Sequence, residues 1–159
     1  MNAPIPQHNA EFKLARLSDA ALIATLARDL VEAGLPWSWR PKRVAASIRH
    51  PETNVLTVWV DGRLRGFAIM EFLVEHAHLN LLAVEPSYRR FGLGRQLVEW
   101  LEETARVGGI RTIKLEVRAG NSDARVFYQR LGYREMNTIP GYYGRRETAV
   151  CMEHDLSRR

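Results

Sequence analysis

Residues 81–94 read LLAVEPSYRRFGLG and continue into the helical pattern RQLVEWLEETARVGG. An apolar strand over residues 79–84 stops before Pro86, and a basic turn with Gly92 and Gly94 opens the following helix. The first turn of a helix leaves backbone N–H groups unpaired and carries a partial positive charge. The junction therefore predicts a site for an anion, most simply a phosphate, which the glycine backbone can approach closely.

Three known loop patterns compete for this stretch. A phosphate-binding P-loop needs Gly-Lys-Ser/Thr, but no lysine or hydroxyl residue follows Gly94. A dinucleotide fingerprint needs a third small residue where Leu97 stands. The third pattern is Arg89-x-x-Gly92-x-Gly94 after an apolar strand, and it resembles the pyrophosphate-binding loop of the GNAT superfamily of N-acetyltransferases.

The resemblance continues downstream and covers residues 79–152. LEVRA at 115–119, Asn121, and FYQRLGY at 127–133 follow in the order and spacing of that family. Within it, the chain is most similar to the bacterial enzymes that acetylate the N-terminal alanine of a ribosomal protein. The resemblance implies an α/β fold, α+β in some schemes. It would hold a single mixed, mostly antiparallel sheet of about seven strands, helices on both faces and a central splayed parallel pair.

Length and composition set broad limits. At 159 residues we expect one N-acetyltransferase domain over 1–159, with residues 1–9 flexible. One cysteine excludes an internal disulfide, and the start lacks an export signal, so a cytoplasmic protein is expected. No apolar run reaches the roughly 18 residues of a membrane helix. The net charge of +5 favours an anionic ligand, although nucleic acid is not expected as the main one. We expect a monomer or a homodimer.

The N-terminal part predicts a strand within 12–17, then a helix capped by Ser18, and a second helix over 41–48 that begins with a proline. Trp37 and Trp39 lie in the loop between these helices. Two tryptophans are costly to leave in water, so they either pack beneath the sheet or line the acceptor site.

A hairpin follows, with strands over 54–60 and 63–74 joined by an Asp-Gly turn. His76 and His78 come next and would share one face of a strand. Without a third ligand in a recognisable position, the pattern favours a solvated strand edge over a metal site, and no metal is expected.

The C-terminal half predicts a strand over 112–117 and a helix capped by Asn121 or Ser122. Strands over 133–138 and 147–156 would close the sheet, joined by a loop. The segment from 79 to 117 is long enough for a right-handed crossover between parallel strands.

By resemblance, acetyl-CoA is the donor cosubstrate. Its pyrophosphate would bind backbone N–H groups over 90–95, and its thioester would lie between strands 79–84 and 112–117. The cofactor-binding residues implied are Leu82, Ala83, Val84, Arg89, Arg90, Phe91, Gly92, Leu93, Gly94, Arg95, Asn121 and Tyr128. Phe91 replaces the basic residue usual before the first loop glycine, which matters little because backbone groups do most of the binding.

The resemblance also supplies catalytic candidates. Glu116 matches the proposed general base, although a glutamate beside Arg118 could instead form an ion pair. Tyr128 matches the proton donor to the leaving sulfur, although it also lies on an apolar helix face. A backbone N–H near Ala83 or Val84 would stabilise the charge on the tetrahedral intermediate.

The acceptor is the least determined element. Deprotonating an α-amine of pKa about 7.8 at pH 7 costs roughly 1 kcal/mol, against nearly 5 for a lysine at about 10.4. A single carboxylate therefore favours a protein or peptide α-amine. Tyr142 and Tyr143 in the closing loop either clamp such an end or cover the sheet. A small amine or lysine acceptor, or a non-catalytic acyl-CoA sensor, are the alternatives.

Overall fold

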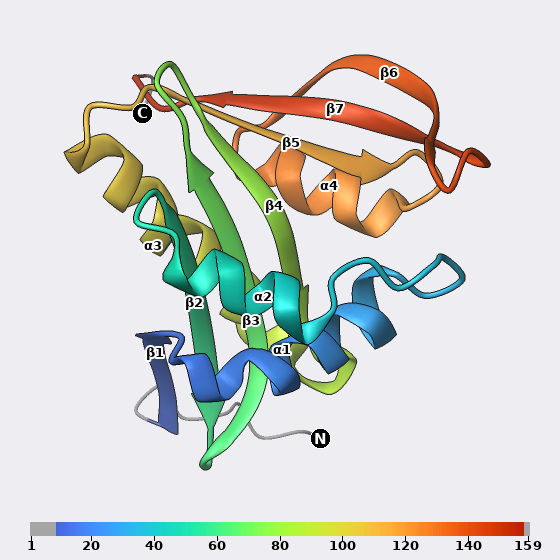
Figure 1. Cartoon of the computed structure of the whole chain (residues 1–159). Helices are drawn as coiled ribbons and strands as arrows, with labels where there is room; N and C mark the ends of the chain where they lie inside the picture. The colour runs from blue at the N-terminus through green and yellow to red at the C-terminus, as the bar shows by residue number, and fades with distance from the viewer. Residues whose placement is uncertain (1–8, 158–159) are drawn as a thin grey trace. The chain divides into compact units, whose positions relative to one another are not determined.

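The computed structural model describes residues 9–157, so residues 1–8 of the expected flexible segment lie outside it (Figure 1). Its strands are β1 Ala10–Leu14, β2 Thr53–Val60, β3 Arg63–Phe72, β4 Ala77–Val84, β5 Thr112–Arg118, β6 Arg134–Tyr143 and β7 Glu147–Asp155. Its α-helices are α1 Ala20–Leu26, α2 Pro41–Arg49, α3 Leu93–Val107 and α4 Ser122–Arg130. Shorter turns of helix cover Leu17–Asp19, Ala27–Val31 and Pro86–Phe91.

The strands form a seven-stranded sheet in the order β1-β2-β3-β4-β5-β7-β6. Strands β4 and β5 pair in parallel, whereas β1 with β2, β5 with β7 and β6 with β7 pair antiparallel. The expected mixed α/β sheet and its parallel pair are confirmed. The chain divides into two compact units, Met1–Met70 with Leu81–Leu101 and Glu71–Asn80 with Glu102–Arg159.

The first unit packs helices α1 and α2 against one face of its strands (Figure 1). Side chains alternate along β2, so Val55 joins this core while Leu56 and Val58 are buried on the other face. Burial of each such side chain stabilises the fold by about 1.5–3 kcal/mol. This core contains Ala20, Ile23, Ala24, Ala27, Trp39, Val44, Val55, Leu64, Phe67, Ile69, Leu81 and Ala83.

The start of the first helix differs from the prediction. Ser18 does not cap it but lies inside the short 3₁₀ turn Leu17–Asp19. The buried carboxylate of Asp19 instead accepts a hydrogen bond of 2.8 Å from the backbone N–H of Arg16. A carboxylate is a stronger acceptor than a hydroxyl. The 3₁₀ turn therefore comes first, and α1 begins at Ala20, one residue later than predicted.

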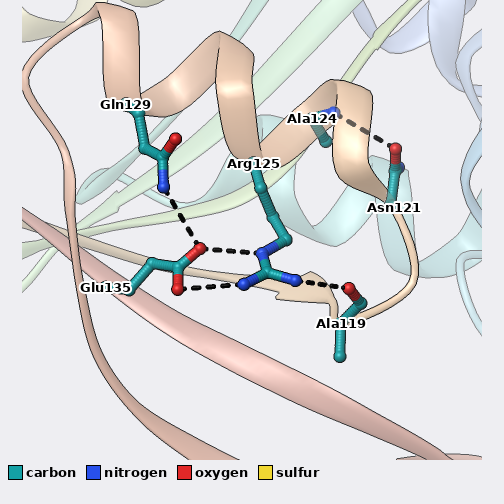
Figure 2. Close-up of polar contacts among 6 residues, drawn as sticks. All are labelled: Ala119, Asn121, Ala124, Arg125, Gln129 and Glu135. Carbon is teal, nitrogen blue, oxygen red and sulfur yellow. Dashed lines mark hydrogen bonds and ion pairs between the residues drawn. The ribbon is translucent and has the colours of Figure 1, made fainter.

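The second unit anchors helix α4 through polar contacts shown in Figure 2. Asn121 is the cap, because its Oδ1 accepts a bond of 3.1 Å from the N–H of Ala124. Arg125 donates to both carboxylate oxygens of Glu135 at 2.7 and 3.0 Å and to the carbonyl of Ala119 at 2.8 Å. One arginine thereby joins α4 to β6 and to the end of β5.

Strand β6 is longer than predicted. The segment assigned to a loop at 139–146 continues as strand through Tyr143, which pairs with Glu147. Two register shifts interrupt its pairing with β7, between Glu135 and Asn137 and between Ile139 and Tyr143. Such irregularities accommodate Pro140 and Gly141, which argued for a loop in the sequence.

Glu102 of α3 belongs to the second unit, and its buried carboxylate has two partners. The Oε2 atom of Glu102 accepts a bond of 2.9 Å from the hydroxyl of Tyr133 and lies 2.8 Å from Nδ1 of His154. Gly132 allows this arrangement, because its φ is +100° and an added Cβ would lie 2.7 Å from Nε2 of His154. The sequence offered no sign of this network, since Glu102 lies in a run of charged helix residues.

Glu102→Ala should lower the free energy of unfolding by about 2–4 kcal/mol, because it leaves the Tyr133 hydroxyl and Nδ1 of His154 without their hydrogen-bond partner. Urea denaturation followed by circular dichroism measures the change. Glu103→Ala is the matched control, because that side chain is 61% exposed and its pairing with Arg106 at 3.5 Å should contribute under about 0.5 kcal/mol. Equal losses for both variants would contradict the structural role of Glu102.

Candidate active site

The loop after β4 has the backbone geometry of an anion site. Gly92 adopts a left-handed conformation with φ +74°, and α3 begins at the next residue. The N–H of Gln96 donates to the carbonyl of Gly92 at 3.1 Å, which is the first full helical bond. The N–H groups of residues 93–95 precede it, as the free N–H groups of a first helical turn do.

Two arginines brace the strand end that leads into this loop. Arg89 donates from Nε to the carbonyl of Val84 at 3.0 Å. Arg65 binds Glu85 at 2.8 Å, and its guanidinium lies 4.6 Å from the ring centre of Tyr88. The side chain of Arg89 is thus turned back toward the strand, which fixes the path of the backbone.

Backbone alternation identifies which N–H groups of β4 are directed away from β3. The N–H of Glu85 donates to the carbonyl of Arg65 on β3 at 2.8 Å. In an antiparallel pair, alternate residues direct their N–H groups to the same neighbour. Ala83 therefore directs its N–H toward β3, whereas Val84 and Leu82 direct theirs to the opposite edge.

Glu116 is the centre of a polar network within the second unit. Its Oε1 and Oε2 lie 2.8 and 3.1 Å from Nε2 of His78, and Tyr142 donates its hydroxyl to Oε1 at 3.1 Å. Nδ1 of His78 is hydrogen-bonded to Oδ1 of Asn80. The expectation of a solvated strand edge at His76 and His78 is wrong for His78, which is partly buried against Glu116.

The parallel ladder of β4 with β5 ends at His78. In the described chain it joins Ala77 to Ile113 and His78 to Lys114, while both strands continue beyond these pairs. Side chains of β5 alternate, so Leu115 is buried while Glu116 lies on the same face as Lys114. His78, in the last pair of the ladder, therefore contacts Glu116, which lies two residues beyond its ladder partner Lys114.

The network shifts the pKa of both partners. The hydrogen bond to Glu116 raises the pKa of His78 above its ordinary value, against the opposing effect of burial. Burial alone would raise the pKa of Glu116, but the hydrogen bond and charge of His78, with the bond from Tyr142, bring it below its ordinary value. The pair is thus stabilised as imidazolium and carboxylate.

Arg118 pairs with a different carboxylate. Its Nη1 lies 3.4 Å from Oε2 of Glu147, and its guanidinium lies 5.8 Å from the ring centre of Tyr143. Glu116 has a partner that the sequence did not predict, His78. The sequence missed this partner because His78 is 38 positions away.

Tyr128 is only 7% exposed and packs among aromatic rings. Phe127 and Tyr133 approach it edge-on, with ring centres 5.1 and 5.5 Å away. Burial raises the pKa of the Tyr128 phenol well above its ordinary value. The hydroxyl therefore keeps its proton throughout the physiological pH range.

The two loop tryptophans differ in burial. Trp39 is 8% exposed and belongs to the core of the first unit, whereas Trp37 is half-buried with Arg28 and Arg40 over its ring. Both positions depend on Glu32, a buried carboxylate that sequence reasoning missed. It accepts bonds of 2.8 Å from the backbone and hydroxyl of Ser38 and of 2.7 Å from the N–H of Trp39.

Within 9–157, no cluster of three or more His, Cys, Asp or Glu side chains could hold a metal ion. No helix in that range is long and apolar enough to cross a membrane.

Comparison with known proteins identifies the family. The model of the acetyltransferase (GNAT) family matches residues 22–133. The chain belongs to the GNAT family. It is 38% identical over 125 residues to the [ribosomal protein bS18]-alanine N-acetyltransferase of Escherichia coli (strain K12), a match that covers 77% of this chain and 82% of the relative.

Solved structures agree with this GNAT assignment. The crystal structure of the Escherichia coli ribosomal-protein-S18-alanine N-acetyltransferase matches with TM-score 0.81 and 29% identity over 94% of this chain and 96% of that chain. PaiA N-acetyltransferase from Thermoplasma acidophilum, in complex with coenzyme A, shares the fold with TM-score 0.80 and 20% identity over 92% and 98% of the two chains. The chain is an acetyl-CoA-dependent N-acetyltransferase.

Proposed function

We propose that this GNAT enzyme transfers the acetyl group of acetyl-CoA directly to the α-amine of a protein or peptide, with N-terminal alanine as the preferred acceptor. Its similarity to bS18-alanine N-acetyltransferases supports the acceptor class. The observation that carries the chemistry is Glu116, a partly buried carboxylate with an imidazole and a phenol in its hydrogen-bond shell. A sensor of acyl-CoA would need the loop but not this network.

The loop of the first unit would bind the pyrophosphate of acetyl-CoA. Its backbone N–H groups over 90–95 would hold the phosphate oxygens, which suits the free donors of the first turn of α3. An added Cβ at Gly92 would meet no described atom within 4 Å, so the loop leaves room there. Arg90 and Arg95 are exposed and would add positive charge, while Arg89 holds the strand end.

The strand end would serve the acyl arm of the cofactor. Because Val84 directs its N–H away from β3, we assign it as the donor to the thioester carbonyl oxygen in preference to Ala83. Leu82, Phe91, Leu93 and Gly94 would line the path of the arm. Asn121 uses its Oδ1 as a helix cap, so its Nδ2 amide is the group that would meet the cofactor.

Acetyl-CoA supplies an acyl group on a good leaving thiolate. In the proposed step the amine nitrogen forms a bond to the carbonyl carbon and the carbon–sulfur bond breaks. Glu116 takes the first proton, which the ammonium must lose before attack, and Tyr128 donates its phenolic proton to the departing sulfur. The second proton, which the nitrogen loses as the amide forms, returns to the Tyr128 oxygen through solvent. The raised pKa of Tyr128 keeps that proton in place until negative charge develops on the sulfur.

Aromatic side chains provide the candidate contacts for the acceptor end. Tyr142 is 47% exposed and already donates to Glu116, so a peptide N-terminus would displace or share this bond. Tyr143 packs edge-on against Tyr142 with ring centres 4.9 Å apart. In the first unit, half-buried Trp37 is the more accessible of the two tryptophans, and Trp39 would support its loop.

A panel of acceptors tests this proposal. Coenzyme A release should be measured with a peptide that begins with alanine, the same peptide blocked at its N-terminus but carrying a lysine, and a small aliphatic amine. We expect kcat/KM to be at least about tenfold higher for the free α-amine, since deprotonating it at pH 7 costs roughly 4 kcal/mol less than deprotonating lysine. Faster turnover of the lysine or the small amine would reassign the acceptor, and binding of acetyl-CoA without turnover would indicate a sensor.

We further propose that residues 1–159 form one N-acetyltransferase domain, since the family match at 22–133 includes parts of both compact units. A ribosomal-protein acceptor, as named for the relatives, would be met in the cytoplasm, which we propose as its location.

A further inference from the structure

We propose that the proton acceptor of this enzyme is the His78–Glu116 pair, in which Glu116 faces the amine and His78 stores the proton. This inference rests on the proposed role of Glu116 as general base. His78 acts through Glu116 and is therefore a positioning and proton-storing residue. It lies on β4, and Glu116 lies on β5, within the same compact unit.

The first observation is the geometry of the contact. Nε2 of His78 lies within 3.1 Å of both carboxylate oxygens of Glu116, and 2.8 Å from the nearer one. The two side chains are 25% and 18% exposed, so water screens the contact little. A surface ion pair formed by chance would be longer and more exposed.

The second observation concerns the other ring nitrogen. Oδ1 of Asn80 accepts the proton of Nδ1, so this nitrogen is the donor and Nε2 faces the carboxylate. The carboxylate is an acceptor only, so the 2.8 Å contact of Nε2 requires a proton between the two groups, and the observed pair is in its protonated form. When that proton is released, Nε2 becomes the lone-pair nitrogen that can take the next one, because Nδ1 stays bonded to Asn80.

The pair also compensates for the low pKa of a single carboxylate as a base. A carboxylate near its ordinary pKa of about 4.3 is more than three units below an α-ammonium at about 7.8, so proton transfer is over a thousandfold uphill. A pair that holds its proton with a pKa above that of ordinary histidine, about 6.5, removes most of that gap. His78 thus makes Glu116 an adequate base for an α-amine.

The first proton that leaves the ammonium has a defined place in this scheme. The ammonium N–H bond breaks, and Glu116 receives that proton on the oxygen that faces the amine. The proton then passes across the carboxylate to Nε2 of His78, and Glu116 returns to the anion. The imidazolium later releases its proton to solvent.

Other charged groups surround the pair, and their influence is part of the pH response. Titratable and charged side chains of the neighbouring strands are Glu71 of β3, Lys114 and Arg118 of β5, Tyr142 and Tyr143 of β6, and Cys151 and Glu153 of β7. Lys114 pairs with Glu153 at 3.5 Å and Arg118 with Glu147 at 3.4 Å, so these charges largely balance. Glu71 adds to the attraction of His78 for a proton.

His78→Gln tests the pair through the pH dependence of acetylation of an N-terminal alanine peptide. Glutamine can still donate a hydrogen bond to Glu116 but cannot store a proton. We expect kcat at pH 7.5 to fall about tenfold and the acid limb to move at least one unit lower, because the acceptor is then a lone carboxylate. His76→Gln, the same change at the neighbouring histidine outside this network, should leave both values unchanged.

The acid limb of the pH–rate profile can arise from the enzyme or from the α-amine of the substrate. Two acceptor peptides whose α-amines differ in pKa distinguish the two, because only the limb of the substrate moves with the peptide. An unchanged profile for His78→Gln would overturn the proposal. So would a loss of rate that is uniform across pH, since that pattern marks a structural role. Circular dichroism spectra establish that each variant is folded.

Imidazole NMR provides a readout that needs no turnover. The His78 resonance, assigned by its loss in His78→Gln, should titrate above the ordinary pKa in the unmodified chain and shift down in Glu116→Gln. A His78 that titrates at or below its ordinary value, or that is insensitive to Glu116→Gln, would refute the pair. If Glu116→Gln abolishes activity while His78→Gln does not, the proposed base stands and only the pair fails. If neither variant loses activity, the proposed base itself is wrong.

Discussion

Glu116→Gln should lower kcat about 10²-fold at pH 7, because it removes the group that takes the ammonium proton while keeping the size of the side chain. The loss should shrink toward pH 9, where most of an α-amine of pKa about 7.8 is already neutral. Steady-state coenzyme A release with an N-terminal alanine peptide, measured from pH 6 to 9, gives both values. Binding of acetyl-CoA, measured by calorimetry, should be unaffected.

Glu153→Gln is the matched control for this change. It removes a carboxylate from the neighbouring strand β7, where Glu153 pairs with Lys114 at 3.5 Å. Its rate should stay within about twofold of the unmodified enzyme, since a partly exposed pair contributes little. A loss for Glu116→Gln that is equally large at all pH values would instead assign Glu116 to positioning the acceptor.

Tyr128→Phe should lower kcat by about tenfold to a hundredfold while the Kd of acetyl-CoA stays nearly constant. The phenyl ring keeps its contacts with Phe127 and Tyr133, so the change removes one hydroxyl from a packed site. Without that hydroxyl, the sulfur must leave as an unprotonated thiolate. Single-turnover kinetics isolate this step from product release.

Tyr133→Phe serves as the control for Tyr128→Phe. It removes the hydroxyl that donates to Glu102 at 2.9 Å, so it should lower stability by about 1–2 kcal/mol without changing the chemical step. An unchanged kcat for Tyr128→Phe would reassign Tyr128 to core packing. The two substitutions thereby separate a hydroxyl used in chemistry from one used in folding.

Elements with local signals were predicted well. The apolar strand, Gly92 and the periodic helix that follows are each specified by residues close in the sequence, and all three occur as β4, the loop and α3. The parallel pairing of β4 with β5 followed from the length of the crossover between them. Local propensity and packing agree in these segments.

Predictions failed where distant partners override local preference. Pro140 and Gly141 indicated a loop, but pairing with β7 extends β6 through Tyr143. The failure at Ser18 was local: the Asp19 carboxylate binds the N–H of Arg16, so a 3₁₀ turn forms over 17–19 and Ser18 lies inside it.

In the candidate site, too, residues in a local motif were predicted, whereas residues with distant partners were not. Glu116 and Tyr128 were predicted as catalytic residues because they match a motif with fixed spacing. His78, in contrast, looked like a solvated residue, because its partner is 38 positions away. Glu102 was missed because its partners Tyr133 and His154 are also distant in the sequence. Glu32 was missed although Ser38 and Trp39 are close to it, because a charged residue in a helical pattern is usually exposed.

The position of the acetyl group on the product decides whether the enzyme acetylates an α-amine. A peptide that begins with alanine and contains an internal lysine should be incubated with acetyl-CoA and the enzyme, then analysed by tandem mass spectrometry. One acetyl group on the α-amine is expected for each coenzyme A released. Acetylation of the lysine, or coenzyme A release without an acetylated α-amine, would contradict this expectation.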